Sequence, residues 1–285
     1  MNLSNIGTAF LVGDSGGTNT SWCYVDREGT QSYFETESYH PQNWNSDFFK
    51  EMNAFWQGFK LPKNLKLYFY GAGMGTETNR QKLKHHFKQF DFDIEDIDTD
   101  AMGALKAFHG KEKGYLAILG TGSILMRQGE AGDITKTGGL GHVKGDEGSG
   151  FYFGKILIKA WMNNQLSVDL CRKLNQVFTN KEKIWSQVNS AEGKKKMSQM
   201  AKMTSSWSEF SELSTLHEQN IAQFVKTHLL EKTYSNWSIV IIGSYAAAQA
   251  EIIQNKFKNK KFESIRIISS PIKEMVSFLV SGQKK

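Results

Sequence analysis

The sequence has 285 residues, of which 39% are hydrophobic and 22% charged, and this composition is typical of a soluble globular protein with one large or two ordinary domains. It contains no apolar run of about 18 residues and no signal-peptide pattern at its start, so we expect no membrane association and a cytoplasmic location. The net charge is +6 (35 basic minus 29 acidic residues), and the basic stretches 181–196 and 256–261 indicate solvated helix faces rather than a nucleic-acid surface.

Short apolar runs that end in small or acidic residues predict strands, in chain order, at 8–13, 21–26, 65–70, 94–98, 115–119, 238–242 and 265–268, with a further hairpin through 129–132. Helical spacing of apolar residues predicts helices at 44–59, 76–90 and 101–108, a mostly helical stretch at 151–228, an Ala-rich helix after 242 and a terminal helix after Pro271. His85 and His86 lie among polar residues of the second helix, and we expect both to face solvent. Both halves repeat the order hairpin, strand and helix, which indicates two related mixed α/β domains sharing one cleft.

Three predicted strands end in turns of small residues: Asp14–Thr20 (D-S-G-G-T-N-T), Gly120–Ser123 (G-T-G-S) and Gly243–Ala246 (G-S-Y-A). Glycine lets backbone N–H groups approach a phosphate closely because no Cβ stands in the way, and threonine hydroxyls add donors. Neither a Walker P-loop nor the dinucleotide-binding fingerprint G-x-G-x-x-G is present. The turns therefore indicate a phosphate or nucleotide site of another kind.

In this order, the turns resemble the phosphate 1, phosphate 2 and adenosine motifs of the superfamily of sugar kinases, actin and heat-shock ATPases. Gly138–Gly150 (G-G-L-G-H-V-K-G-D-E-G-S-G) is similar to a loop of N-acetylglucosamine kinases and BadF/BadG/BcrA/BcrD ATPases, and Asp98–Ala101 resembles that family's catalytic T-D-A. The resemblance implies an α/β, two-domain ribonuclease H-like fold of the actin type, with mixed sheets and an interdomain cleft. The expected domains are residues 1–105, completed by a C-terminal helix at 272–285, and residues 106–271, with a helical insertion at about 155–230.

The resemblance implies ATP and Mg²⁺ as cofactors. Asp14 would hold Mg²⁺ directly or through water, since magnesium favours few carboxylates combined with phosphates and waters. The alternative interpretation is that Asp14 only caps its turn. The residues implied in ATP binding come from all three turns: Asp14, Gly16, Gly17, Thr18, Asn19, Gly120, Thr121, Gly122, Gly243, Ser244 and Ala246.

Asp100 is the expected catalytic base, which accepts the proton of a sugar hydroxyl as the γ-phosphoryl group leaves ATP. Its place between a strand and a helix N-terminus would keep its carboxylate ionised. The alternative interpretation is a plain N-cap for the helix that begins at Ala101, a common position for aspartate. The family resemblance favours the base.

The resemblance also implies a sugar site formed by His40, Asn43, Asp100, Ser123, Ile124, Gly139 and Asp146. Ile124 stands where the family has a sugar-binding Asn, and an aliphatic side chain offers no hydrogen bond. His40 or Asn43 takes the place of a second Asn, and Ser15 replaces a usual Gly. Glu147 would orient the metal or serve the loop alone, and we expect His142 to be a packed loop histidine. These departures leave the identity of the sugar open.

The leading functional hypothesis is ATP-dependent phosphorylation of an amino sugar such as N-acetylglucosamine or glucosamine, at the 6-OH. One alternative is a nucleotide-binding sugar sensor without turnover, against which the presence of both Asp14 and Asp100 argues. Another is an activator ATPase of 2-hydroxyacyl-CoA dehydratases, which needs two cysteines per subunit for an iron–sulfur cluster. Cys23 and Cys171, which we expect to be buried and reduced, both lie away from G-T-G-S in the sequence. A homodimer is compatible with the resemblance.

Overall fold

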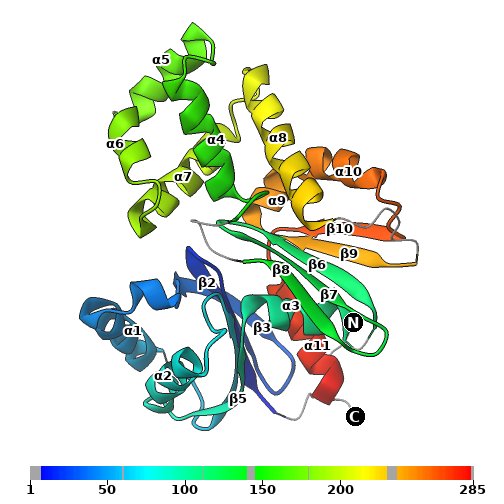
Figure 1. Cartoon of the computed structure of the whole chain (residues 1–285). Coiled ribbons are helices and arrows are strands. Elements are labelled where there is room, and N and C mark those ends of the chain that lie inside the picture. The colour runs from blue at the N-terminus through cyan, green and yellow to red at the C-terminus, as the bar shows by residue number, and fades with distance from the viewer. Residues whose placement is uncertain are drawn as a thin grey trace. The chain divides into compact units, whose positions relative to one another are not determined.

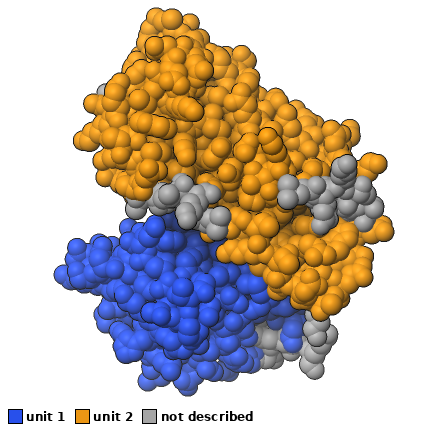
Figure 2. All heavy atoms as spheres, viewed as in Figure 1, with its two compact units in different colours: residues 1–111, 271–285 blue, residues 112–270 orange. Residues whose placement is uncertain are grey.

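In the computed structural model the described residues are 8–59, 61–110, 112–139, 145–178, 180–229 and 236–283. The chain forms two compact units (Figure 2), one of residues Met1–Lys111 with Pro271–Lys285 and one of residues Glu112–Ser270. Each unit contains a five-stranded mixed sheet with helices packed against it (Figure 1), which confirms the predicted α/β class. The centre of the glycine-rich stretch, residues 140–144 with His142, lies outside the described residues.

The sheet of the first unit has the strand order β3-β2-β1-β4-β5. Its strands are β1 (Phe10–Ser15), β2 (Asn19–Val25), β3 (Gln31–Glu37), β4 (Leu65–Gly71) and β5 (Phe92–Asp98). β2 pairs antiparallel with both β1 and β3, whereas β4 pairs parallel with both β1 and β5. The carboxyl ends of β1, β4 and β5 therefore meet at one edge of the sheet.

Helices cover both faces of this first sheet. The helices of the unit are η1 (Pro41–Asn43, a 3₁₀ turn), α1 (Ser46–Gly58), α2 (Glu77–Lys88), α3 (Asp100–His109) and α11 (Ile272–Gln283). α1 and α2 pack on the face that carries Trp22, whose ring makes edge contacts with Tyr39, Trp56 and Phe87. On the other face α3 packs against β4, and α11 packs against α3 and β1.

The second unit repeats the plan of the first, with the strand order β10-β9-β6-β7-β8. Its strands are β6 (Gly114–Leu119), β7 (Ser123–Gln128), β8 (Ile134–Gly138), β9 (Ser238–Ile242) and β10 (Ser264–Ile268). β6, β7 and β8 form an antiparallel meander, and β9 pairs parallel with β6 and β10. The carboxyl ends of β6, β9 and β10 thus share an edge, as those of β1, β4 and β5 do.

The helical stretch of the second unit is a series of short capped helices. The helices are α4 (Gly150–Met162), α5 (Val168–Val177), α6 (Lys181–Ser186), α7 (Ala191–Thr204), α8 (Ser211–His228), α9 (Ser244–Ala248) and α10 (Ala250–Lys258). The side chains of Ser149, Ser167, Asn180 and Ser190 each accept a hydrogen bond from the first turn of the helix that follows, which explains the breaks. α4 packs tightly on α7, and its Gly154 faces the α7 backbone.

Two features differ from the sequence expectations. The edge strand β3 is absent from the predicted strands because most of its residues are exposed, whereas β7 and β8 form the hairpin predicted through 129–132. The expectation that His86 faces solvent is wrong, since only 4% of this residue is exposed and its ring contacts those of Tyr39 and Phe49. Burial lowers the pKa of His86 to about 4.

Gly154→Ala tests the close approach of α4 and α7. Alanine favours a helix over glycine by about 1 kcal/mol, but here its Cβ would overlap the backbone carbonyl of Met197. We expect the free energy of unfolding to fall by about 1–3 kcal/mol, measured by urea denaturation. Gly58→Ala in α1 is the matched control, because its Cβ meets nothing within 4 Å and should leave stability unchanged or raise it. A Gly154→Ala protein as stable as the wild type would contradict this packing.

Candidate active site

The turn between β1 and β2 is fixed at its base and exposed at its tip. The Gly16 N–H donates to the Asn19 carbonyl at 3.0 Å and closes the hairpin. The buried Ser15 hydroxyl accepts hydrogen bonds from Thr20 Oγ1 at 2.8 Å and from the Tyr39 N–H at 3.1 Å. Ser15, where the family has glycine, therefore helps to anchor the turn. The residues at the exposed tip are Gly17, Thr18 and Asn19.

Asp14 and Asp100 lie near enough for the charge of one to affect the other. Asp14 is near the end of β1, and Asp100 is the first residue of α3, directly after β5 and Thr99. Burial, with a contribution from the Asp100 carboxylate, raises the pKa of Asp14 from 3.8 to about 8. A divalent cation would relieve the repulsion, which makes this pair of carboxylates fit Mg²⁺.

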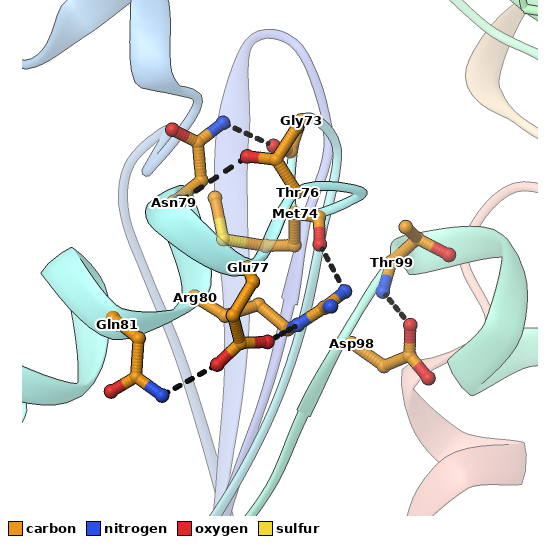
Figure 3. A network of polar contacts seen from close by, with 9 residues as sticks. All are labelled: Gly73, Met74, Thr76, Glu77, Asn79, Arg80, Gln81, Asp98 and Thr99. Atoms are coloured by element: carbon orange, nitrogen blue, oxygen red, sulfur yellow. Dashed lines mark hydrogen bonds and ion pairs between the residues drawn. The ribbon is translucent and has the colours of Figure 1, made fainter.

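The N-cap of α3 is Thr99 rather than Asp100. Thr99 Oγ1 accepts a hydrogen bond from the Met102 N–H at 3.2 Å. The Thr99 N–H donates to Asp98 Oδ1 at 2.7 Å (Figure 3). Lys106 Nζ lies 3.7 Å from Asp98 Oδ2. The interpretation of Asp100 as a plain N-cap is therefore wrong, and capping does not explain an aspartate at this position.

The loop after β4, residues 71–76, also belongs to this region, although the sequence analysis does not include it in the site. Its Ala72 N–H donates to the Ser15 carbonyl at 2.8 Å, and a Cβ on Gly75 would lie 4.0 Å from Thr99 Cγ2. The loop thus connects the first glycine turn with the start of α3. The run G-A-G-M-G-T, at the end of a predicted strand, is the sequence signal from which this loop could have been predicted as part of the site.

Side chains of α2 hold this loop in place (Figure 3). Arg80 Nη1 donates to the Met74 carbonyl at 3.0 Å while its Nε contacts Glu77 at 3.0 Å. Asn79 Nδ2 donates to the Gly73 carbonyl at 2.8 Å. The loop backbone is therefore fixed by a polar network on one side and by strand β4 on the other.

The structure brings His40 to the same loop and gives Asn43 a backbone role. Gly73 has a φ of +85°, and a Cβ there would lie 2.5 Å from Pro41 Cδ and 3.5 Å from His40 Nε2. Asn43 Nδ2 donates to the Ser38 carbonyl at 2.9 Å. His40 thus lies beside the loop. The Asn43 amide instead holds the backbone of the segment that contains His40.

In the second unit, the G-T-G-S turn is fixed by contacts from far along the chain. Gly120 N–H donates to the Gly122 carbonyl at 3.0 Å, and the first N–H of α4, from Gly150, donates to the Gly120 carbonyl at 2.8 Å. The Ser123 N–H donates to Asp146 Oδ1 at 3.0 Å. A Cβ on Gly122 would lie only 2.9 Å from that same oxygen, so glycine is needed here.

Asp146 is bound to the turn that the motifs assign to phosphate. It has a left-handed φ of +74° and only 2% of the residue is exposed. Lys194 Nζ lies 3.4 Å from Asp146 Oδ2, and this oxygen has no hydrogen-bond partner within the described part of the chain. Neither the ion pair nor Lys194 has a local sequence signal, because 48 positions separate the two residues.

Gly139 and Ile124 adjoin each other at the end of β8. The Gly139 N–H donates to the Ser123 carbonyl at 3.0 Å, and its φ of +66° suits glycine. A Cβ there would lie 3.5 Å from Ile124 Cδ1, so the isoleucine packs on this backbone. Glu147 Oε2 lies 3.7 Å from Nε2 of His228, a residue that the sequence analysis missed.

The third turn adjoins the second. Gly243 has a φ of +135°, and a Cβ there would stand 3.0 Å from the Gly120 N and closer still to the Leu119 carbonyl, which excludes larger residues. Ser244 is exposed and Ala246 is buried. The structure therefore brings together the turns assigned to phosphate 2 and to adenosine.

Asn220 of α8 connects the third turn to the Gly145–Ser149 loop. Its Nδ2 donates to the Tyr245 hydroxyl at 2.8 Å and to the Ser149 carbonyl at 2.9 Å, while its Oδ1 accepts from the Gly148 N–H at 2.7 Å. The Tyr245 hydroxyl also lies 2.8 Å from His217 Nδ1. Neither Asn220 nor His217 is distinguished in the sequence, since both lie in an ordinary helical pattern.

A search of the described residues finds no group of three or more His, Cys, Asp or Glu side chains that could hold a metal ion. A metal in the first unit would therefore rely on Asp14, and on phosphate and water oxygens, which suits magnesium. Within the same residues, no helix is both long and apolar enough to cross a bilayer.

Comparison with solved structures identifies the fold. A protein of Porphyromonas gingivalis assigned as an N-acetylglucosamine kinase superposes with a TM-score of 0.78 at 22% identity, covering 95% of this chain and 99% of that one. A protein of Chromobacterium violaceum with the same assignment gives a TM-score of 0.72 at 17% identity, covering 97% and 99%. The chain therefore shares the two-domain α/β fold of these two proteins.

Sequence comparison adds a local match. No protein-family model matches the chain. A curated N-acetylmuramic acid/N-acetylglucosamine kinase of Clostridium acetobutylicum is 44% identical over 64 residues, which are 22% of this chain and 21% of that protein. The match thus spans about a fifth of the length of the curated relative, and it agrees with the resemblance that the motifs carry.

Asp14→Asn tests the electrostatics of the carboxylate pair. Because the folded pKa of Asp14 lies above its ordinary value of 3.8, the folded state holds an extra proton between about pH 4 and 8, and stability is lost as the pH rises through that range. Without metal, the variant should gain stability relative to the wild type, by a margin that grows from pH 5 to about 8. Urea denaturation in EDTA measures this.

Asp93→Asn is the control for this measurement, because Asp93 is an exposed carboxylate of β5. Its stability difference from the wild type should not grow over the same pH range. A flat difference for Asp14→Asn as well would show that Asp14 is ionised in the folded protein.

Proposed function

We propose that this protein transfers the γ-phosphoryl group of ATP to a hydroxyl of an amino sugar. The observation that carries the proposal is the Asp14–Asp100 pair, which the ends of β1 and β5 place beside an exposed glycine turn. Thr99 caps α3, so an aspartate at position 100 has no capping role. The fold shared with N-acetylglucosamine kinases and the local match to a kinase of N-acetylmuramic acid and N-acetylglucosamine support the same reaction.

In the proposed reaction, the oxygen of the sugar hydroxyl attacks the γ-phosphorus of ATP. The bond between that phosphorus and the β–γ bridging oxygen breaks, and ADP leaves with its electron pair. Asp100 accepts the proton of the attacking hydroxyl, and its place at the start of α3 favours the ionised form that this requires.

We assign the phosphates of ATP to Gly16 with the exposed tip at Gly17–Asn19 and to the G-T-G-S turn, and the adenosine to the turn at Gly243–Ala246. Mg²⁺, when bound, supplies positive charge to the phosphate oxygens. Asp14 is the residue that would hold it, and the cation would in turn favour the ionised form of Asp14.

The acceptor side is assigned to Asp100, His40 and the loop at 71–76, which lie together in the first unit. Gly139, Ile124 and Asp146 remain proposed sugar contacts in the second unit. Ile124 packs on Gly139 and offers no polar atom, so we infer that the sugar is recognised through other groups. Phosphorylation at the 6-OH is proposed from the family resemblance.

A coupled ADP-release assay tests the function. Glucosamine, N-acetylglucosamine, N-acetylmuramic acid, N-acetylmannosamine and glucose are offered with Mg-ATP to the wild type, Asp100→Asn and Asp93→Asn. We expect one or more amino sugars to raise ADP release, and Asp100→Asn to lower the sugar-dependent kcat by about 100-fold or more, because it cannot accept the proton. Asp93→Asn removes an exposed carboxylate of β5, the strand that precedes Asp100, and this variant should behave as the wild type.

Two outcomes would change this conclusion. Equal kcat in Asp100→Asn and wild type would remove Asp100 from the reaction. Binding of ATP without sugar-dependent ADP release for any member of the panel would favour a sugar sensor. The activator function gains no support, because Cys23 is buried in the first unit and Cys171 lies in α5 of the second.

A further inference from the structure

The Asp146–Lys194 contact is an ion pair that leaves hydrogen-bonding capacity unused. Asp146 Oδ1 accepts the Ser123 N–H at 3.0 Å, so one oxygen is committed to the G-T-G-S turn. Oδ2 is buried, faces Lys194 Nζ at 3.4 Å, and has no hydrogen-bond partner within the described residues. Buried polar atoms in folded proteins are almost always satisfied, so this oxygen and its cation require an explanation.

The position of Lys194 is built into the fold. Ser190 caps α7, with its Oγ accepting the Gly193 N–H at 3.0 Å, and Gly193 is buried. Of the three consecutive lysines, Lys196 pairs with Glu192 at 2.8 Å, Lys195 is exposed, and Lys194 alone is directed to Asp146, with 23% of its side chain exposed. The Lys-rich segment is thus a solvated helix face with one member turned toward the site.

The surroundings of Lys194 suit an anion more than a metal ion. An ammonium beside Asp146 disfavours a divalent cation on the same carboxylate. The ammonium carries three N–H donors, more than a single contact at 3.4 Å uses. Because Asp146 Oδ1 accepts the Ser123 N–H while Oδ2 faces Lys194, a single carboxylate group links the ammonium to the G-T-G-S turn.

We propose that Lys194 is a nucleotide-binding residue that contacts the phosphate chain of ATP at the G-T-G-S turn. This rests on the proposed function, which assigns phosphate to that turn, and it adds a cation from a helix more than 70 positions further along the chain. In the absence of nucleotide, Asp146 holds the ammonium in place. When ATP binds, the unused donors of Lys194 bond to phosphate oxygens without loss of the Asp146 contact.

Isothermal titration calorimetry with ATP, ADP and adenosine tests this assignment on the full chain. We expect Lys194→Met to weaken ATP binding by about tenfold or more, since a charge-assisted hydrogen bond is lost, and to leave adenosine binding unchanged. Lys194→Gln is measured beside it, because its amide still donates to Asp146 but carries no charge, and it should show the same loss for ATP. Lys195→Met, at an exposed position next to Lys194 in α7, should bind all three ligands as the wild type does.

Three results would overturn the assignment. The first is wild-type affinity for ATP in both Lys194 variants. The second is an equal loss for adenosine and ATP, which would indicate a purely structural ion pair. The third is a raised KM for the sugar with unchanged ATP affinity, which would place Lys194 at the acceptor. Failure of the wild type to bind ATP at all would instead refute the proposed function, and the inference with it.

Discussion

The parallel pairing of strands is the constraint on which the rest of the candidate site depends. In each unit a three-stranded antiparallel meander is followed by two parallel strands, of which one pairs with the first strand of the meander and the other extends the sheet beyond it. Chain direction is thereby the same for β1, β4 and β5, and for β6, β9 and β10, so their carboxyl ends gather at one edge. Five parts of the site are strand ends or the residues that follow them: Asp14, the loop at 71–76, Asp98 to Asp100, G-T-G-S and Gly243.

Rigidity of the second unit's site comes from buried hydrogen bonds between distant parts of the chain. Asn220 uses its amide on Tyr245, Ser149 and Gly148, so the third turn and the Gly145–Ser149 loop share one support. His217 stacks on Phe153 with 3.7 Å between ring centres, and burial lowers its pKa to about 3, which keeps it neutral. A satisfied network of neutral groups fixes a single arrangement at little electrostatic cost.

Much of this arrangement could be predicted from the sequence, because strand ends and glycine turns are local signals. The strands before Asp14, Gly120 and Gly243 and the helix after Thr99 follow from apolar runs and small residues a few positions apart. What was missed is either exposed or distant in sequence. Most residues of β3 are exposed, and His86 is buried by the rings of Tyr39, Phe49 and Phe90. Lys194 contacts Asp146, which lies 48 positions earlier in the sequence, and Asn220 contacts Ser149, which lies about 70 positions earlier. A local sequence pattern cannot predict contacts between residues so far apart.

The candidate residues of the two units differ in charge: the first unit has a pair of carboxylates, and the second has a carboxylate paired with an ammonium. In the first unit, Asp14 and Asp100 form a site that is costly to ionise fully, since burial and mutual repulsion raise the pKa of Asp14. Such a site gains most from a ligand that brings its own cation, as a magnesium nucleotide does. In the second unit, the Asp146 charge is already balanced by Lys194, and the remaining donors of that ammonium favour an anion.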